Sequence, residues 1–338
     1  MSSPLENLLS DRDWLLADGA TGTTLFNMGL QSGDAPELWN VDHPDRITAL
    51  YQGAVDAGSD LFLTNSFGGT RARLKLHDAQ DRAYELNKAA AEIGRAVADK
   101  AGRPVIVAGS VGPTGEIMAP MGTLTHDAAV EMFHEQAEGL RDGGADVLWV
   151  ETISAPEEYA AASEAAKLAG MRWCGTMSFD TAGRTMMGLT SAGMSEMVEK
   201  LDHAPLAYGA NCGVGASDLL RTVLGFRASG SARPVIAKGN AGIPKYVDGH
   251  IHYDGTPDLM AQYAVLARDA GATIIGGCCG TTPDHLRAMR TALEDTPKGA
   301  APSLDQITDA LGGFSSGSDG TDGQAPTRER RSRRRARA

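Results

Sequence analysis

Short apolar runs and longer amphipathic stretches alternate along most of this chain. Each run is almost continuously apolar and rich in β-branched or aromatic residues, which is typical of strands that are buried on both faces. Eight such runs occur, at residues 14–20, 60–67, 105–112, 146–153, 173–179, 206–212, 234–240 and 272–279. We expect each of them to form one short, buried β-strand.

The stretches between the runs carry apolar residues at three- and four-residue spacing, which is the period of an amphipathic helix. Several of them end in glycine, a residue that favours the end of a helix. Thr256 followed by Pro257 also gives a favourable N-cap and first turn. The clearest of these predicted helices cover residues 83–102, 127–144, 155–170 and 256–271.

Eight strands that alternate with helices over about 300 residues predict an α/β fold of the (β/α)8 or TIM-barrel type. The alternative is a doubly wound open sheet, although such sheets more often have fewer strands. A dinucleotide-binding turn would support that alternative, but residues 213–218 carry only the first two glycines of the G-x-G-x-x-G pattern. We therefore expect a barrel, in which functional side chains gather at the carboxyl ends of the strands.

Charge is distributed unevenly along the chain, and the difference is greatest at the carboxyl terminus. The 338 residues carry a net charge of −12, yet residues 328–338 contain seven arginines and one glutamate, so the rest carries about −18. Residues 312–327 are rich in Gly, Ser and Asp, which is the composition of a disordered linker. We expect a barrel domain over residues 1–311 and a disordered tail over residues 312–338. A short basic end on an acidic protein does not lead us to expect a nucleic acid partner.

The sequence also limits the compartment and the partners. No stretch has the basic-then-apolar form of a signal peptide, and no apolar run approaches the roughly 18 residues that span a bilayer. We expect a cytoplasmic protein without a membrane partner. In that reducing compartment, few and clustered cysteines indicate metal binding or catalysis rather than structural disulfides. The sequence leaves the oligomeric state open, a homo-oligomer included.

Three of the four cysteines fall at predicted strand ends. Cys212 ends the sixth run, and the adjacent Cys278 and Cys279 end the eighth. One strand lies between the sixth and the eighth strand, so the ends of these two strands are about 10 Å apart. Side chains that lean inward can close this gap. Three thiolates with one open position predict a catalytic zinc site, because a structural zinc is closed by four protein ligands. Other polar residues at strand ends are Asp18, Asn65, Ser110, Glu151, Ser178, Asp180, Lys238 and Asn240.

Plainer interpretations compete with the metal site. A buried cysteine is usually a small apolar side chain, which is our interpretation of Cys174 in the middle of the fifth run. A disulfide between Cys278 and Cys279 would form a strained ring and would be reduced in the cytosol. The glycines on both sides of this pair permit the backbone turn that lets two neighbouring side chains serve one point.

Five segments resemble the successive signature segments of the homocysteine S-methyltransferase family. They read LLADGATGTTL, TNSFGGT, WVETISAPEE, GANCG and GGCCGTTPDHL, and the resemblance extends from about residue 10 to residue 295. The family includes betaine–homocysteine methyltransferases and the homocysteine domain of cobalamin-dependent methionine synthase. The whole chain is most similar to the compact bacterial proteins that are called betaine–homocysteine methyltransferases.

The resemblance implies a barrel methyltransferase that forms methionine. Cys212, Cys278 and Cys279 would bind Zn²⁺, with the sulfur of homocysteine as the fourth ligand. The thiol of homocysteine is mostly protonated at neutral pH and the thiolate is the nucleophile, so a Lewis acid that binds sulfur would raise the reactive fraction.

The resemblance also assigns the amino-acid end of the substrate. Glu151 would bind the ammonium group of homocysteine. The turn after the first strand would present Asp18 and the backbone of Gly19 to the same end. Asn65, at the end of the second run, is a further candidate for substrate contact.

The donor is less determined, and we expect glycine betaine or a related onium compound. Such a donor loses its charge in the transfer, so a dry site with aromatic faces for the cation would favour the reaction. Trp39, Phe67 and Tyr51 are the candidates for that contact, with Trp39 in a long loop that can cover the barrel mouth. Animal betaine enzymes, however, have tyrosines where this chain has Gly68 and Thr152.

Two alternatives stay open. In the first, the chain is the homocysteine-activating subunit of a split cobalamin-dependent methionine synthase and takes the methyl group from a separate corrinoid protein. Such a partner would be needed because the nearest match to the Asp-x-His-x-x-Gly cobalamin pattern, at residues 248–253, ends in tyrosine. In the second, the barrel is a non-catalytic zinc or redox protein.

Overall fold

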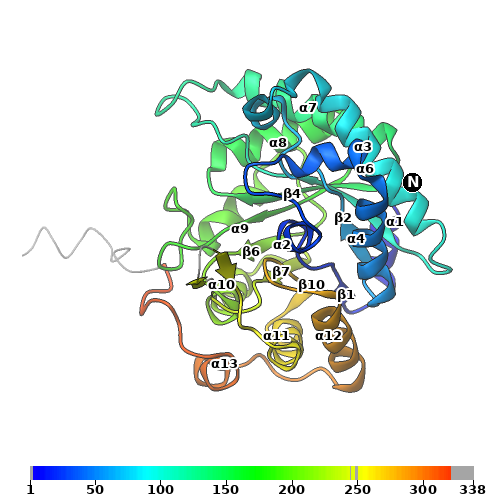
Figure 1. Ribbon diagram of the computed structural model, residues 1–338. Helices are drawn as coiled ribbons and strands as arrows, with labels where there is room; N and C mark the ends of the chain where they lie inside the picture. Colours follow the sequence, from blue (N-terminus) through cyan, green and yellow to red (C-terminus); the bar gives the residue numbers. More distant parts are fainter. Residues whose placement is uncertain (1–2, 244, 248–249, 321–338) are drawn as a thin grey trace, which may run out of the picture.

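A computed structural model of the chain describes residues 3–243, 245–247 and 250–320. Eight strands form one parallel sheet in the order β1-β10-β7-β6-β5-β4-β3-β2, with helices around it (Figure 1). The predicted (β/α)8 barrel is confirmed. Its strands are β1 Leu15–Leu16, β2 Leu61–Leu63, β3 Ile106–Val111, β4 Val147–Ile153, β5 Trp173–Met177, β6 Tyr208–Cys212, β7 Val235–Gly239 and β10 Ala272–Gly277; β8 Lys245–Val247 and β9 His250–His252 form a separate hairpin.

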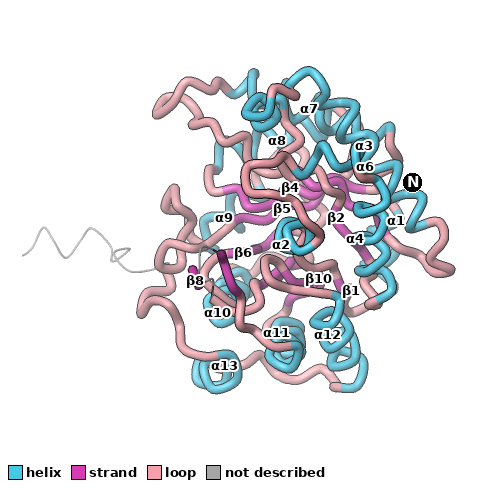
Figure 2. Tube along the Cα trace, in the orientation of Figure 1, coloured by secondary structure: helices cyan, strands magenta, loops and turns pink. Residues whose placement is uncertain are grey.

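The helices lie outside the strands (Figure 2). The four clearest predicted helices are all present, and each is shorter than the amphipathic stretch that predicted it. Thr256 caps its helix as expected, because its side chain accepts a hydrogen bond from the Leu259 N–H. The α-helices are α1 Pro4–Asp11, α2 Gly22–Asn27, α3 Trp39–Asp42, α4 Pro44–Asp56, α5 Arg71–Leu74, α6 Ala83–Ala98, α7 His126–Asp142, α8 Pro156–Leu168, α9 Ser191–Glu199, α10 Ala216–Ala228, α11 Pro257–Asp269, α12 Pro283–Asp295 and α13 Leu304–Leu311.

Two aspartates close the barrel between β1 and β2, the strands at the two ends of the sheet order. The Asp60 N–H donates to the Leu16 carbonyl at 2.7 Å, and the Asp60 carboxylate accepts from the Leu16 N–H at 2.9 Å. At the other end of this seam, the Asp18 carboxylate accepts from the Leu63 N–H at 2.8 Å. Side chains thus supply hydrogen bonds where β1, only two residues long, offers few of its own.

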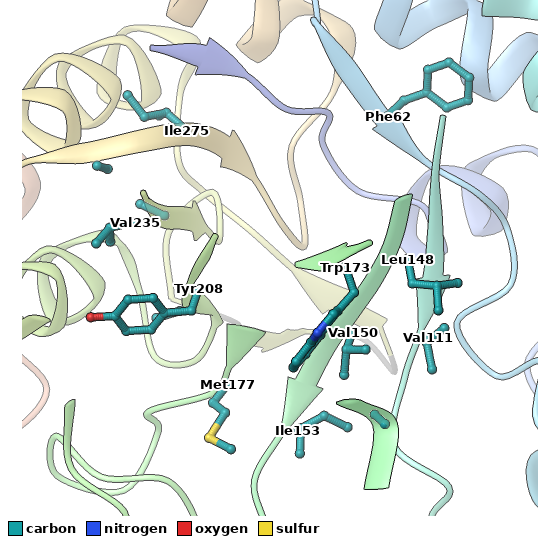
Figure 3. Close-up of a cluster of buried hydrophobic side chains, with 14 of the residues drawn as sticks. Phe62, Val111, Leu148, Val150, Ile153, Trp173, Met177, Tyr208, Val235 and Ile275 are labelled. Atoms are coloured by element: carbon teal, nitrogen blue, oxygen red, sulfur yellow. The ribbon is translucent and has the colours of Figure 1, made fainter. Parts of the chain in front are cut away.

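The strands separate two apolar layers. One buried cluster takes side chains from the runs of all eight barrel strands, for example Leu61, Trp149 and Ile236, and therefore fills the barrel interior. The other cluster lies between the strands and the helices; Figure 3 shows part of it, including Phe62 and Trp173. The alternation in direction along each strand sends neighbouring residues into different layers. Cys174 lies in the barrel interior, fully buried and unpaired, as expected of an apolar core residue.

The first part of the segment after α13, for which the composition predicts a disordered linker, makes contacts with the barrel. Residues 312–320 lie against α10, where the Arg221 guanidinium stands 4.4 Å from the centre of the Phe314 ring. The Asp218 carboxylate also accepts a hydrogen bond from the Ser315 N–H at 2.9 Å. One aromatic residue and a few backbone hydrogen bonds suffice to anchor a segment whose composition is otherwise polar. The arginine-rich run lies outside the described residues.

Within the described part of the chain, no helix is long and apolar enough to cross a membrane.

Asp60 generates a stability prediction. Its side chain is almost fully buried and pairs with Arg12 at 2.6 Å and Arg290 at 3.1 Å. Asp60→Ala would remove these pairs and the side-chain bond across the seam, so we expect it to lower the free energy of unfolding by about 3 kcal/mol. Urea denaturation would measure the change. Asp13→Ala, at an exposed site nearby, is the control; equal stability of the two variants would refute a role for Asp60 in closure.

Candidate active site

A cavity of about 370 Å³ opens at the carboxyl ends of the barrel strands. Its walls come from segments that are far apart in the sequence, because parallel strands in a barrel all end at the same rim. Among the residues that line it are Gly19, Asn65, Phe67, Ser110, Glu151, Cys212, Lys238, Cys278 and Cys279. Most of the site residues expected from the sequence therefore surround one cavity.

The structure brings three cysteines together at this cavity. The sulfur atoms of Cys212, Cys278 and Cys279 all lie within 4.8 Å of one another, and each residue is half-buried and unpaired. Ligands that share one zinc ion stand about 2.3 Å from it, so sulfur atoms at this spacing fit a common metal. Soft sulfur donors favour a thiophilic ion such as Zn²⁺ over Mg²⁺ or Mn²⁺.

The backbone turns sharply at both cysteine segments. Cys212 has φ of 61° and Gly213 has φ of 75°, values in the left-handed region that a residue with a side chain seldom adopts. Gly280 has φ of 80°, directly after the cysteine pair, where the Cys278 carbonyl accepts hydrogen bonds from the N–H and the hydroxyl of Thr281. These turns direct sulfur atoms from separate strands to one point, and the left-handed Cys212 is a local strain of the kind found at functional sites.

Two asparagines hold the cysteine segments in place, and the sequence analysis gave neither of them a role. Asn240 donates to the Gly213 carbonyl at 2.9 Å and accepts from the Cys279 N–H at 3.0 Å, so it joins the two segments. Asn211 lies beside Cys212 and donates toward the Cys278 sulfur at 3.8 Å and to the Thr152 hydroxyl at 2.8 Å. Two features of the sequence could have indicated these roles. Asn211 directly precedes Cys212, and Asn240 follows the strand that lies between the two cysteine strands.

The thiols are not acidic on their own. Contact with Cys278 lowers the pKa of Cys212, but contact with Cys279 and burial outweigh this effect and raise that pKa to about 11. Three thiolates so close together would repel one another strongly unless a cation lay between them. The cluster therefore suits a metal ion that displaces the thiol protons as it binds.

Glu151 presents a carboxylate to the cavity. It is buried, and one of its oxygens accepts a hydrogen bond from the Ser110 hydroxyl at 2.6 Å. The other oxygen makes no hydrogen bond with the described residues. Burial raises the pKa of Glu151, whereas the nearby ammonium of Lys238 opposes that rise. An ammonium group from a ligand could pair with the available oxygen.

The carboxylate of Asp18, which the resemblance assigns to the amino-acid end of the substrate, is engaged within the protein. It accepts from the Lys238 ammonium at 2.5 Å and from the Leu63 N–H at 2.8 Å, so the protein already uses both oxygens. Asp18 itself is not among the cavity residues, whereas Gly19 and Lys238 are. Lys238 is the functional candidate that the sequence analysis noted at a strand end and then left without a role.

Asn65 lines the cavity but has its side-chain amide engaged. It donates to the Pro36 carbonyl at 2.7 Å and to the Asn40 side chain at 3.0 Å. Its backbone N–H donates to the Tyr51 hydroxyl at 2.6 Å. Asn65 therefore fixes the loops around the mouth of the cavity.

Of the aromatic residues expected at the donor site, only Phe67 lines the cavity. Trp39 is buried, and the Arg46 guanidinium lies over its ring at 4.6 Å. Tyr51 is also buried and stacks on Phe62 with ring centres 4.9 Å apart. This geometry gives no support to a lid formed by Trp39, because its ring already packs within the protein.

Glu37 is a carboxylate at the cavity wall that the sequence analysis missed. It is buried and accepts a hydrogen bond from the Gly68 N–H at 2.7 Å. A Cβ atom at position 68 would lie 3.0 Å from a Glu37 oxygen, so a tyrosine would not fit there without a shift of Glu37. The difference from the animal betaine enzymes at Gly68 thus has a structural counterpart. In the sequence, the feature that could have pointed to Glu37 is an acidic residue two positions before Trp39.

The fold and the site define a class of protein: an α/β barrel with a three-cysteine cluster at the active-site end. The family model for homocysteine S-methyltransferase matches residues 15–293. The chain belongs to the homocysteine S-methyltransferase family.

Individual relatives agree with this assignment. The chain is 30% identical over 306 residues to a methionine synthase of Mycobacterium leprae; the match covers 85% of this chain and 25% of that protein. This chain thus corresponds to about a quarter of the relative's length. Among solved structures, the oxidised form of the homocysteine methyltransferase MmuM from Escherichia coli has a TM-score of 0.70 at 25% identity, covering 86% of this chain and 99% of that one. The metallated form of MmuM has the same TM-score and identity, and covers 85% of this chain and 99% of that one.

Glu151 yields a prediction about substrate binding. If its available oxygen binds the ammonium of homocysteine, Glu151→Gln should weaken homocysteine binding by about 1.5–3 kcal/mol, the range for a hydrogen bond to a charged group. Calorimetry on the zinc-loaded protein would measure this loss, and zinc content should stay unchanged.

Glu158→Gln is the matched control. Glu158 is also a buried carboxylate, but it holds Thr114 and does not line the cavity. Undiminished homocysteine affinity in Glu151→Gln, or the same loss in Glu158→Gln, would remove Glu151 from the binding site.

Proposed function

We propose that this protein is a zinc-dependent methyltransferase that transfers a methyl group to the sulfur of homocysteine and forms methionine. The observation that carries this proposal is the meeting of three cysteine sulfur atoms within 4.8 Å at the wall of the cavity. A three-cysteine set leaves one ligand position for a substrate thiol, as catalytic zinc sites do. Membership of the family supports homocysteine as that substrate.

Each residue of the site would have a separate role in this reaction, according to its position. Cys212, Cys278 and Cys279 would hold the zinc, which when bound would lower the pKa of a coordinated thiol and keep it as thiolate near neutral pH. Glu151 would bind the substrate ammonium and so aim the sulfur at the cluster. Asn240 would keep the two cysteine segments at a fixed spacing through its bonds to Gly213 and Cys279.

For the donor, we favour a methyl group delivered by a separate carrier protein, as in the split methionine synthase alternative. Most exposed large apolar side chains of the described residues lie in segments that follow the carboxyl ends of strands, the end of the barrel at which the cavity opens: Phe26, Leu76, Ile117, Met121, Met186, Met187 and Ile243. Leu76 lines the cavity itself. Exposed apolar side chains around a site are typical of a surface that meets another macromolecule. The similarity to a methionine synthase of which the match covers only 25% also supports a carrier, a corrinoid protein in this proposal.

Glycine betaine is the second candidate donor, and two residues favour it. The ring of Phe67 and the carboxylate of Glu37 both line the cavity, and either could stabilise a quaternary ammonium group. Of the three aromatic residues expected to surround the cation, however, only Phe67 lines the cavity.

The metal site has a direct test. Replacing Cys212, Cys278 or Cys279 with Ala should abolish stoichiometric zinc binding and methionine formation, since two sulfur ligands hold zinc far more weakly than three. Circular dichroism should remain that of the folded barrel. Cys174→Ala is the control and should keep both zinc and turnover, because Cys174 lies in the barrel interior. Metal analysis that finds full zinc in a cluster variant would contradict the assignment.

The donor has a test in which each outcome selects one candidate. The zinc-loaded protein is incubated with homocysteine and, separately, methylcobalamin, betaine, dimethylsulfoniopropionate or S-methylmethionine. We expect methionine with methylcobalamin, which carries the reactive methyl group of a corrinoid protein, and none with betaine. Methionine and dimethylglycine in equal amounts from betaine would instead select the onium donor. In that case Phe67→Leu should raise the betaine KM severalfold through loss of about 0.5–2 kcal/mol of cation–π interaction.

A further inference from the structure

A methyl donor that reaches homocysteine in this cavity also meets the protein's own cysteines. Cys212, Cys278 and Cys279 line the cavity, and as zinc ligands they would be thiolates, which are nucleophiles. If a cysteine sulfur attacked the methyl carbon, the bond between that carbon and the donor would break and the donor would leave with the bonding electrons. The cysteine would become a neutral methyl thioether, and the cluster would lose an anionic ligand. The site therefore needs its own sulfur atoms to be less reactive than that of the substrate.

Two asparagine side chains each donate a hydrogen bond to one cysteine sulfur. Asn240 donates to the Cys212 sulfur at 3.7 Å, and Asn211 donates to the Cys278 sulfur at 3.8 Å. In each amide the oxygen accepts from a backbone N–H, so the nitrogen is the atom that faces the sulfur.

Tyr253 supplies a hydrogen bond to the third sulfur. It directly follows β9, and its side chain is hydrogen-bonded to that of Cys279. A phenol beside a thiolate is the donor, because the thiolate has no hydrogen to give. The Tyr253 side chain lies against Gly280, where a Cβ atom would collide with it. This contact holds the hydroxyl beside the cysteine turn.

The hydrogens of these three donor groups are fully used. An amide has two N–H groups and a phenol has one O–H. The second N–H of Asn240 goes to the Gly213 carbonyl at 2.9 Å. The second N–H of Asn211 goes to the Thr152 hydroxyl at 2.8 Å. With the single O–H of Tyr253 on a cysteine, none of the five hydrogens remains for a sulfur that enters the fourth ligand position.

We propose that Tyr253, Asn211 and Asn240 protect the three cysteines from methylation and so direct the methyl group to the substrate. The inference rests on the proposed function, in which the cysteines hold zinc and homocysteine brings the fourth sulfur. A hydrogen bond stabilises a thiolate and lowers its nucleophilicity. The homocysteine sulfur, which receives none of these bonds, stays the most reactive of the four. Each of the three residues acts through a cysteine and is thus a positioning residue.

Tyr253→Phe tests the inference, because it removes one hydroxyl and keeps the ring against Gly280. The zinc-loaded protein, without homocysteine, is treated with a limiting amount of methyl iodide, and mass spectrometry of its peptides gives the initial rate of methylation at each cysteine. Loss of one hydrogen bond should raise the nucleophilicity of Cys279, and we expect its methylation to be about 3- to 10-fold faster than in wild type. Cys212 and Cys278 keep their donors and should react at the wild-type rate.

Tyr208→Phe is the matched control. Tyr208 is buried, and its hydroxyl is hydrogen-bonded to Ser195 rather than to a cysteine, so all rates should stay those of wild type. An unchanged rate at Cys279 in Tyr253→Phe would overturn the inference. Equal acceleration at all three cysteines together with loss of zinc would also overturn it, since Tyr253 would then only support the fold of the cluster. A wild type that binds no zinc would reject the proposed function, and the inference with it.

Discussion

Closure of the barrel between β1 and β2 is the constraint on which the rest of the structure depends. A strand of two residues cannot form a long ladder, and the carboxylates of Asp18 and Asp60 supply bonds across this seam instead. Asp60 is neutralised by arginines near the amino ends of the strands. Asp18, toward the carboxyl ends, is paired with Lys238. Each buried charge therefore needs a cation, and the cation at the active-site end is brought into the cavity.

This pairing fixes a cation in the wall of the cavity. A lysine held by Asp18 remains charged inside the protein, and it lies near Glu151, a carboxylate whose pKa burial raises. Charges fixed in a low-dielectric site attract groups of opposite charge, and little reorganisation is required when a ligand arrives. The cysteine cluster adds a third fixed point. In the proposed function, the sulfur of homocysteine would meet this cluster and its ammonium would meet Glu151, and the two contacts would orient the thiol.

The part of the cavity where a methyl donor would enter in the proposed function is organised differently. Its walls hold Phe67, Glu37 and the exposed apolar side chain of Leu76. A small cation needs enclosure by aromatic faces, whereas a methyl group on a large carrier needs an open mouth with a surface to dock on. The cysteine cluster lies at the strand ends, whereas Phe67 and Glu37 lie in connecting segments, so a change in the loops can alter the second part of the cavity without moving the first.

The sequence by itself determined the barrel, because continuous apolar runs that alternate with amphipathic stretches have few ways to bury both faces of every strand. It also determined the three cysteines as candidates, since Cys212 and Cys278 follow strands that stand one strand apart at the same rim. Only the tertiary structure decided which polar groups were available to a ligand. Asp18 is taken up by Lys238, and Trp39 is covered by Arg46. Partners far apart in the sequence set the availability of a charge or a ring, and local pattern carries no information about such contacts.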